Sequence, residues 1–147
     1  KEAGKYIDDY FLAYPRMKEF LDGLVAEGKG AGEVKTMYGR IRPIPELSSS
    51  NFMQRQFGER IAMNSPIQGT AADIIKIAMV RVYRRLKAEL PEARLILQVH
   101  DELIVEAPES QAEQAARILT EEMQGAVKLT VPLTADAKEG KTWYDAH

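Results

Sequence analysis

The sequence contains no cysteine, only two histidines, and no long apolar run. Without cysteine, the chain can form neither a disulfide framework nor a thiolate metal site. A bilayer-spanning helix needs roughly 20 apolar residues, and a secretory signal needs an apolar core that the opening "KEAGKYIDDYF" does not have. These absences predict a soluble protein and make the cytoplasm its default compartment.

Length and composition are those of a folded domain, since 147 residues that are 45% hydrophobic can bury a core. The net charge of −2 is unevenly spread, because residues 1–91 carry +4 and residues 92–147 carry −6. A basic half followed by an acidic half permits a polyanion site beside a cation site. Two differently charged solvated surfaces would give the same distribution.

In the first third of the chain, apolar residues at three- and four-residue spacing predict a pair of helices over residues 1–27, bent or restarted at Pro15. The glycines of "GKGAG" predict a flexible loop at 28–32. A short strand is expected at 34–38, and Pro43 and the next proline should prevent regular structure after it. The pattern therefore predicts helices followed by an extended loop in this segment.

The next segment predicts two helices in succession. "SSSN" favours a helix start, and the residue before Pro66 disfavours helical backbone, so the first helix should end there. The second helix is expected to begin with Thr70 as its cap and to close at Pro91. Its apolar face is expected to consist of Ile74, Ile75, Ala78, Met79, Val82 and Leu86. Apolar residues four apart predict the buried stripe of the first helix: Met53, Phe57 and Ile61.

The last third predicts strands around one helix. "LILQVHDELIVEAP" reads as two short strands joined by a tight turn, and Ser110 with Glu113 matches a capping box that opens a helix. Its inward residues are expected to be Ala112, Ala115, Ala116, Leu119, Met123 and Val127. "KLTVPLTADA" alternates like a strand, and Pro132 places it at a sheet edge. The predicted class is α+β: a small antiparallel sheet with a central β-hairpin, packed against helices.

His100, Asp101 and Glu102 interrupt the apolar run at the expected hairpin tip. At such a tip adjacent side chains can reach one cleft while the flanking apolar residues anchor the backbone. Ionised carboxylates beside an apolar sheet need compensation, and paired hard oxygen ligands favour magnesium or manganese. A plain polar turn is the alternative, since Asp is a common turn residue.

Two further groups of residues are suited to binding nucleic acid. Arg60 and Asn64 lie four residues apart on one expected helix face and Gln68 follows, and such side chains can form forked hydrogen bonds with phosphates and base edges. Arg40 and Arg42 lie on a loop that could hold a phosphate backbone. Taken alone, each group is more simply explained as a polar helix face or a basic loop.

Taken in order, "TMYGRIRPIPEL", "ERIAMNSPIQGTAADIIKIAM", "LQVHDELIVEAP" and the closing "GKTWYDAH" resemble the C-terminal part of bacterial DNA polymerase I-like enzymes, the family A DNA polymerases. The resemblance covers essentially the whole chain. It implies a DNA-directed DNA polymerase that transfers dNMP from dNTP to a primer 3′-hydroxyl with pyrophosphate release. The implied partners are primer–template DNA, dNTPs and the rest of the polymerase, at the nucleoid, in replication and repair.

The resemblance also implies roles for single residues. Asp101 and Glu102 correspond to the carboxylates at the two Mg²⁺ ions, for which Mn²⁺ can substitute, and His100 to the histidine against the primer end. Residues implied to contact DNA are Arg60, Asn64, Gln68, Arg40 and Arg42. Where the family usually has a further arginine this chain has Ile41, so the loop has one basic side chain fewer for contact with DNA.

The same resemblance implies that the chain is a fragment. Residues 1–47 would be the end of the fingers with a connecting loop, and residues 48–147 would be most of the palm. The family's first catalytic motif would lie outside it, so the fragment alone is expected to be inactive.

Two other classes of function compete with this reading. A non-catalytic nucleic-acid-binding module is disfavoured by the Asp101–Glu102 pair, because carboxylates facing phosphate would weaken binding. A metal-dependent phosphohydrolase would need further ligands, and the only other histidine is His147, at the chain end.

Overall fold

The computed structural model describes residues 2–146, and it confirms the α+β class. Lys1, where the first helix was expected to begin, and His147 lie outside the described residues. The chain divides between Thr70 and Ala71 into two compact units, each of which is described by itself. Within the described residues, no helix is long and apolar enough to cross a membrane.

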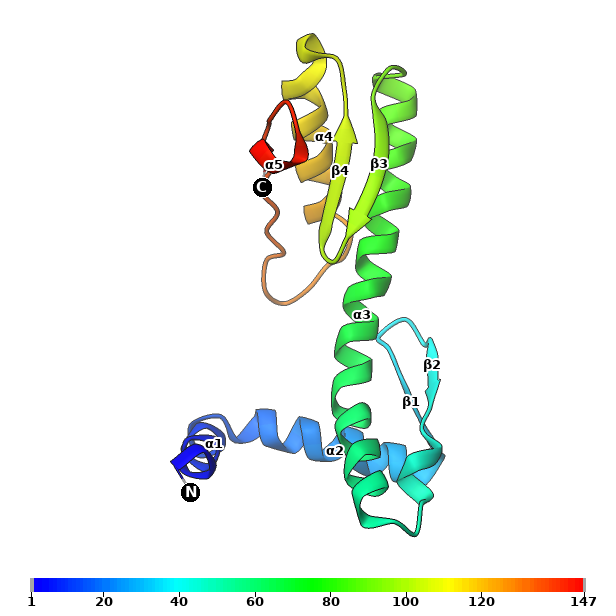
Figure 1. Ribbon diagram of the computed structural model, residues 1–147, viewed down its shortest axis with the longest axis vertical. Helices are drawn as coiled ribbons and strands as arrows, with labels where there is room; N and C mark the ends of the chain where they lie inside the picture. Colours follow the sequence, from blue (N-terminus) through cyan, green and yellow to red (C-terminus); the bar gives the residue numbers. More distant parts are fainter. Residues whose placement is uncertain (1, 147) are drawn as a thin grey trace. The chain divides into compact units, whose positions relative to one another are not determined.

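The first unit contains two helices, a small β-hairpin and the beginning of a long third helix (Figure 1). Its elements are α1 (Glu2–Ala13), α2 (Pro15–Ala31), β1 (Glu33–Lys35), β2 (Ile41–Pro43), the 3₁₀ helix η1 (Pro45–Ser48) and the first part of α3 (Phe52–Glu89). β1 and β2 pair antiparallel, with Val34 opposite Arg42. Its core consists of Val34, Ile44, Leu47 and Ala62.

The helical pair is confirmed, but the flexible loop predicted at 28–32 is wrong. Helix α2 continues to Ala31 and ends at Gly32, whose φ of 72° is left-handed and whose amide donates to the Gly28 carbonyl at 2.8 Å. Gly28 is buried, and a Cβ there would lie 3.0 Å from Cδ1 of Leu47. It allows a close approach rather than a flexible loop.

The prolines after β1 do not prevent regular structure, contrary to expectation. Pro43 is the last residue of β2, where it lacks an amide but still extends the strand, and Pro45 is the first residue of η1. Both positions suit a residue with fixed φ and no amide hydrogen. The pairing of β1 with β2 was not predicted, because a three-residue strand offers almost no alternation to detect.

Helix α3 starts as predicted and does not stop where predicted. The Asn51 Oδ1 atom accepts from the amides of Met53 at 2.9 Å and Gln54 at 3.4 Å, which is an N-cap. The expected break at Pro66 and the cap at Thr70 are both wrong, because α3 runs through them to Glu89. An internal proline costs a helix about 3 kcal/mol. Burial of α3 side chains in a core on either side of Pro66 offsets that cost.

The buried stripe of α3 is also different from the expected one. Met53 and Phe57 are 69% and 49% exposed, whereas Gly58, Ala62 and Pro66 are buried. A Cβ on Gly58 would lie only 2.9 Å from the Leu47 backbone nitrogen. The helix therefore packs through a face of small residues, which lets backbones approach each other closely. A search for large apolar residues does not find such a face.

The second unit places the rest of α3 and a second antiparallel hairpin against one further helix (Figure 1). Its elements are β3 (Arg94–Val99), β4 (Glu102–Glu106), the 3₁₀ helix η2 (Glu109–Gln111), α4 (Ala112–Gln124) and the short α5 (Trp143–Ala146). Its buried core residues are Ala78, Val82, Leu86, Leu90, Ala93, Leu103, Ala115, Ile118 and Ala126.

Three predictions for the second unit are corrected. Ser110 does not cap α4, because it lies within η2 and no side chain caps the helix. The innermost residue of α4 is Ile118, at 0% exposed, which the predicted inward set omitted. Residues 128–137 form no strand, and Val131 is exposed. Alternation alone does not make a strand, because a strand also needs hydrogen bonds to a neighbouring strand, and the β3–β4 sheet contains only these two strands.

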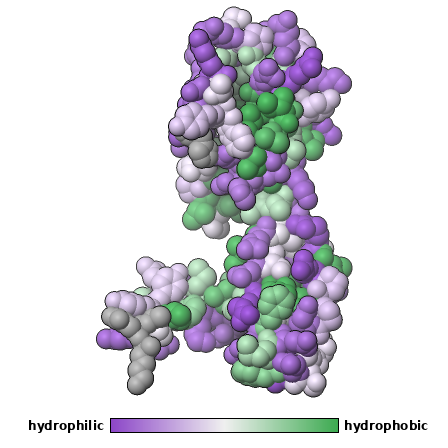
Figure 2. Space-filling view, viewed as in Figure 1, coloured by the Kyte–Doolittle hydropathy of each residue, from purple (hydrophilic) through white to green (hydrophobic). Residues whose placement is uncertain are grey.

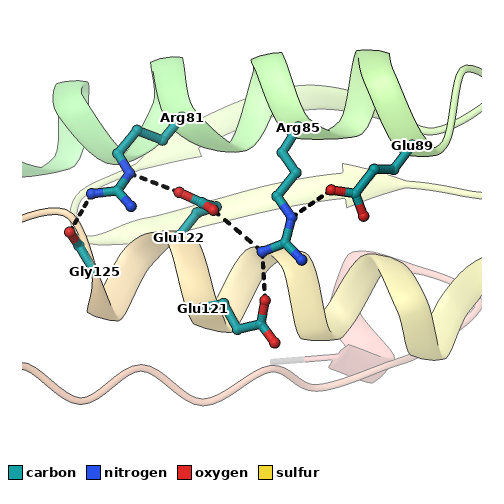
Figure 3. A network of polar contacts seen from close by, with 6 residues as sticks. All are labelled: Arg81, Arg85, Glu89, Glu121, Glu122 and Gly125. Carbon is teal, nitrogen blue, oxygen red and sulfur yellow. Dashed lines mark hydrogen bonds and ion pairs between the residues drawn. The ribbon is translucent and has the colours of Figure 1, made fainter.

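Arginines of α3 and glutamates of α4 form an ion-pair network that joins the two helices (Figure 3). The Nε atom of Arg81 lies 2.7 Å from Glu122, and Arg85 contacts Glu121 at 2.5 Å and Glu122 at 3.2 Å. Arg81 also donates to the Gly125 carbonyl beyond the end of α4. The hydrogen bond from Arg81 holds the pKa of the Glu122 carboxyl below its usual value, with a smaller contribution from Arg85.

Candidate metal-binding hairpin and nucleic-acid interface

The predicted turn between β3 and β4 is confirmed, and His100 and Asp101 are its two central residues. The His100 backbone has a φ of 51°, which makes it the only non-glycine residue with positive φ in the described part of the chain. Tight two-residue hairpin turns require positive φ at this first position, where glycine or asparagine is usual. Gln98 donates its side-chain amide to the His100 carbonyl at 2.6 Å, which helps to hold the turn.

The faces of this hairpin are set by a bulge. Leu95 is opposite Val105 while Leu97 is opposite Ile104, so Ile96 is an extra residue that reverses the alternation along β3. Leu103 is 6% exposed and faces the core. Because neighbouring strand residues point to opposite faces, Glu102 lies on the outer face with Ile104.

Apolar side chains reach the surface of this hairpin. Figure 2 shows hydrophobic surface in this part of the second unit, and Ile96 and Leu97 of β3 are both exposed. The segment is therefore less buried than its sequence suggested. The carboxylates lie at the end of a strand pair that is anchored on one face only.

Asp101 and Glu102 are suited to a hard divalent cation. Asp101 is exposed at the turn and Glu102 begins β4, so two carboxylate groups lie next to each other in the sequence at one end of the hairpin. Magnesium is commonly held by one or two carboxylates, with water and substrate phosphates as the other ligands. No group of three or more Asp, Glu, His or Cys side chains that could hold a metal occurs within residues 2–146. These two carboxylates fit an ion whose other ligands are water and substrate phosphates.

In the first unit, Arg60, Asn64 and Gln68 are all exposed and recur every four residues along α3. Each lies two positions after a member of the buried stripe Gly58, Ala62 and Pro66. Two residues correspond to about 200° of helix rotation, so the polar stripe faces directly away from the core of this unit. Arg60 lies over the Phe57 ring at 5.8 Å, which orients the guanidinium on that face.

Arg40 and Arg42 both belong to the small hairpin of the first unit. Arg42 is exposed on β2, and Arg40 ends the turn before it. The Nη2 atom of Arg40 donates to the Gly69 carbonyl of α3 at 2.8 Å. No sequence pattern predicts this contact, which brings Arg40 to the helical turn that carries Gln68.

The structure thus gathers the candidate residues into two groups. His100, Asp101 and Glu102 are consecutive at one turn of the second unit, while the polar stripe of α3 and the two arginines of the hairpin belong to the first. Hydroxyl contacts support the residues of the first unit: the Met37 amide of the small hairpin donates to the Thr70 hydroxyl of α3, and the Arg40 amide donates to the Thr36 hydroxyl within the hairpin. Hydroxyl contacts of this kind have no periodic sequence signal.

Comparison with known proteins identifies the family. The model of DNA polymerase family A matches residues 1–145. The chain is 51% identical over 146 residues to DNA polymerase I of Geobacillus stearothermophilus and 49% identical over 146 residues to that of Bacillus subtilis. Each match covers 99% of this chain and 17% of the relative.

A solved structure agrees with this. The POL domain of Pol1 from M. smegmatis, in complex with DNA primer–template and dNTP, is 39% identical and superposes with a TM-score of 0.93. The match covers 99% of this chain and 26% of that one. The chain belongs to DNA polymerase family A, and it spans about one sixth of the length of the curated relatives that it matches.

Proposed function

We propose that this chain contributes to template-directed DNA synthesis, in replication and repair. The primer 3′-hydroxyl would attack the α-phosphorus of a dNTP, the bond from that phosphorus to the bridging oxygen would break, and pyrophosphate would leave. The observation that carries the proposal is the Asp101–Glu102 pair at the β3–β4 turn, in a chain of this family. In this assignment residues 1–47 are the end of the fingers and residues 48–147 are most of the palm.

Asp101 and Glu102 would hold two Mg²⁺ ions, or Mn²⁺ in their place, together with carboxylates from elsewhere in a polymerase. When bound, such ions activate the attacking hydroxyl and stabilise the leaving pyrophosphate. The role of the protein residues themselves is to bind and orient the substrates. By its correspondence to the family, His100 would lie against the primer terminus, and it is a central residue of the β3–β4 turn.

The polar stripe of α3 would follow the DNA. Arg60 and Asn64 would contact template and primer, and Gln68 would contact minor-groove acceptors, which occur in every correct base pair. Such a contact checks the geometry of the pair without reading its sequence. Arg40 and Arg42 would bind backbone phosphates. A protein with these partners acts at the nucleoid.

The direct test is primer extension by a chimera in which residues 1–147 replace the matching segment of the Geobacillus polymerase. Asp101→Asn removes the charge and keeps the shape, and we expect extension with Mg²⁺ to fall by at least about 10²-fold, since several kcal/mol of metal-ion stabilisation is lost. Glu106→Gln, the matched control at the other end of β4, should retain activity. Equal activity of Asp101→Asn and the parent chimera would refute the catalytic assignment.

The chain alone is expected to bind primer–template DNA without extending it, because the described residues provide no third metal ligand beside the pair. Binding is measured by fluorescence anisotropy over a range of salt concentrations. Loss of Arg42 should reduce the salt dependence by about one counterion. Binding that persists while the Asp101→Asn chimera keeps full activity would favour a non-catalytic binding module.

A further inference from the structure

The turn of α3 from Pro66 to Thr70 is a weak point in the helix, and it carries Gln68. Proline has no amide hydrogen, so the Ala62 carbonyl lacks the helical partner that it would have at position 66. Helices commonly kink at such a position. The helix nevertheless continues through Pro66 without interruption.

The turn between β1 and β2 contacts this weak point at two places, within the first unit (Figure 1). The Met37 amide donates to the Thr70 hydroxyl at 3.0 Å, and that hydroxyl donates to the Pro66 carbonyl at 2.6 Å. Arg40 donates to the Gly69 carbonyl at 2.8 Å. The hairpin therefore bonds directly to the Gly69 carbonyl and the Thr70 hydroxyl, and it reaches the Pro66 carbonyl, on the other side of Gln68, through that hydroxyl.

Thr36 gives the β1–β2 turn its shape and also meets the helix. Its hydroxyl oxygen accepts from the amides of Tyr38 at 3.3 Å and Arg40 at 3.2 Å. Its methyl carbon lies only 2.6 Å from where a Cβ on Gly69 would be. Real Cβ atoms do not approach this closely, so glycine at 69 is a condition of the contact.

We propose that the β1–β2 turn is a positioning element for Gln68, in which Thr36, Arg40 and Thr70 hold the proline-weakened turn of α3 in one geometry. The inference rests on the proposed contact of Gln68 with DNA. Gln68 is exposed, whereas Gly69 and Thr70 face the hairpin, so these residues act on Gln68 through the helix backbone.

The test uses the 147-residue chain and two measurements: hydrogen exchange of the α3 amides near Gln68, and affinity for primer–template DNA. Gly69→Ala adds a methyl group that collides with the Thr36 methyl, although alanine is the better helix former. We expect faster exchange in this turn and an affinity about three- to tenfold lower, the loss expected for one hydrogen-bonded contact.

The decisive variant is the double one. Thr36→Ser removes the methyl carbon and keeps the hydroxyl, so alone it should change neither measurement. Combined with Gly69→Ala it should restore both, because the next atom, on Arg40, lies 3.3 Å from the added Cβ. Gly30→Ala is the matched control, since no atom lies within 4 Å of its Cβ position.

A second pair covers the case in which Gly69→Ala does not fold. Thr70→Val keeps the shape of the side chain but cannot accept the Met37 amide or donate to Pro66, whereas Thr70→Ser retains both bonds. We expect Thr70→Val to behave like Gly69→Ala and Thr70→Ser like the parent. A double variant no better than Gly69→Ala, or a Thr70→Val affinity equal to that of the parent, would overturn the positioning role.

Gln68→Ala separates this proposal from the one on which it rests. If its affinity equals that of the parent, Gln68 does not contact DNA and the proposed function loses that contact. If Gln68→Ala weakens binding while Gly69→Ala speeds exchange without weakening binding, the Gln68 contact stands and the positioning role fails.

Discussion

The two units of this chain are stabilised by different kinds of contact. The first has a core of only four buried apolar residues, and glycines of α2 and α3 let backbones and small side chains approach closely around it. The second buries nine apolar residues and joins α3 to α4 through arginines and glutamates. The first unit should therefore be damaged by adding atoms, and the second by removing atoms or charges.

The largest expected effect comes from emptying the core of the second unit. Ile118→Ala removes a side chain that is 0% exposed, and such a cavity costs about 2–5 kcal/mol. Urea unfolding gives the free energy, and hydrogen exchange should show the loss in α4, β3 and β4 rather than in β1 and β2. Val131→Ala, at an exposed apolar position, is the control. Equal losses in both units would show that they do not unfold separately.

The next effect comes from adding a single carbon to the first unit. Gly58→Ala places a Cβ 2.9 Å from the Leu47 nitrogen and 3.1 Å from the Glu46 carbonyl carbon. Backbone atoms cannot rotate away, so we expect a loss of about 1–3 kcal/mol, measured by the same unfolding experiment. Gly30→Ala should instead be neutral or stabilising by up to about 1 kcal/mol. A neutral Gly58→Ala would mean that η1 moves easily relative to α3.

These two positions also show what the sequence could and could not predict. Apolar residues at helical spacing predicted the second half of α3 correctly, since Ala78, Val82 and Leu86 are buried there. The same rule was mostly wrong in the first half, where the buried stripe begins with Gly58, Met53 and Phe57 are exposed, and Ile61 alone of the predicted stripe packs against the core. A search for apolar periodicity favours large side chains. It cannot detect a position such as Gly58, where neighbouring backbone occupies the space that a side chain would need.

The site was predictable to a similar extent. The β3–β4 turn and its three ionisable residues followed from local pattern, because the two strands are adjacent in the sequence. The contacts of Met37 and Arg40 with α3 join residues about thirty positions apart, and they depend on a helix that continues through Pro66. Local rules predict a break there, since the compensating burial comes from tertiary structure.

A smaller and pH-dependent effect is expected from the charged network of the second unit. The pKa of Glu122 is lowered in the folded state, so the carboxylate contributes stability at pH values above its unfolded pKa of about 4.3. That contribution is lost as the pH falls through the folded-state pKa. Glu122→Gln should therefore cost about 1 kcal/mol at pH 7 and progressively less below about pH 4. Thermal unfolding over this range measures the difference.

The control for the network is Glu113→Gln, an exposed glutamate in the first turn of α4. Its effect should be small at every pH. A Glu122→Gln loss that stayed constant down to pH 3 would show that the side chain acts through packing rather than charge, and the contrast between the two units would then rest on apolar burial alone.

The smallest effect on stability is expected at the β3–β4 turn, and it has the opposite sign. His100 has a φ of 51°, a conformation that costs a side-chain-bearing residue about 1 kcal/mol or more and costs glycine almost nothing. His100→Gly should therefore stabilise the second unit slightly, by less than about 1 kcal/mol, because the greater freedom of the unfolded glycine offsets part of the gain.

If His100 lies against a primer terminus, the same change should lower primer extension by the chimera. His100→Asn, which tolerates this φ and keeps a polar side chain, separates backbone strain from loss of the imidazole. A turn that becomes more stable and less active would mean that the strained residue is kept for its side chain, whereas a turn that loses stability would mean that the imidazole itself stabilises the hairpin.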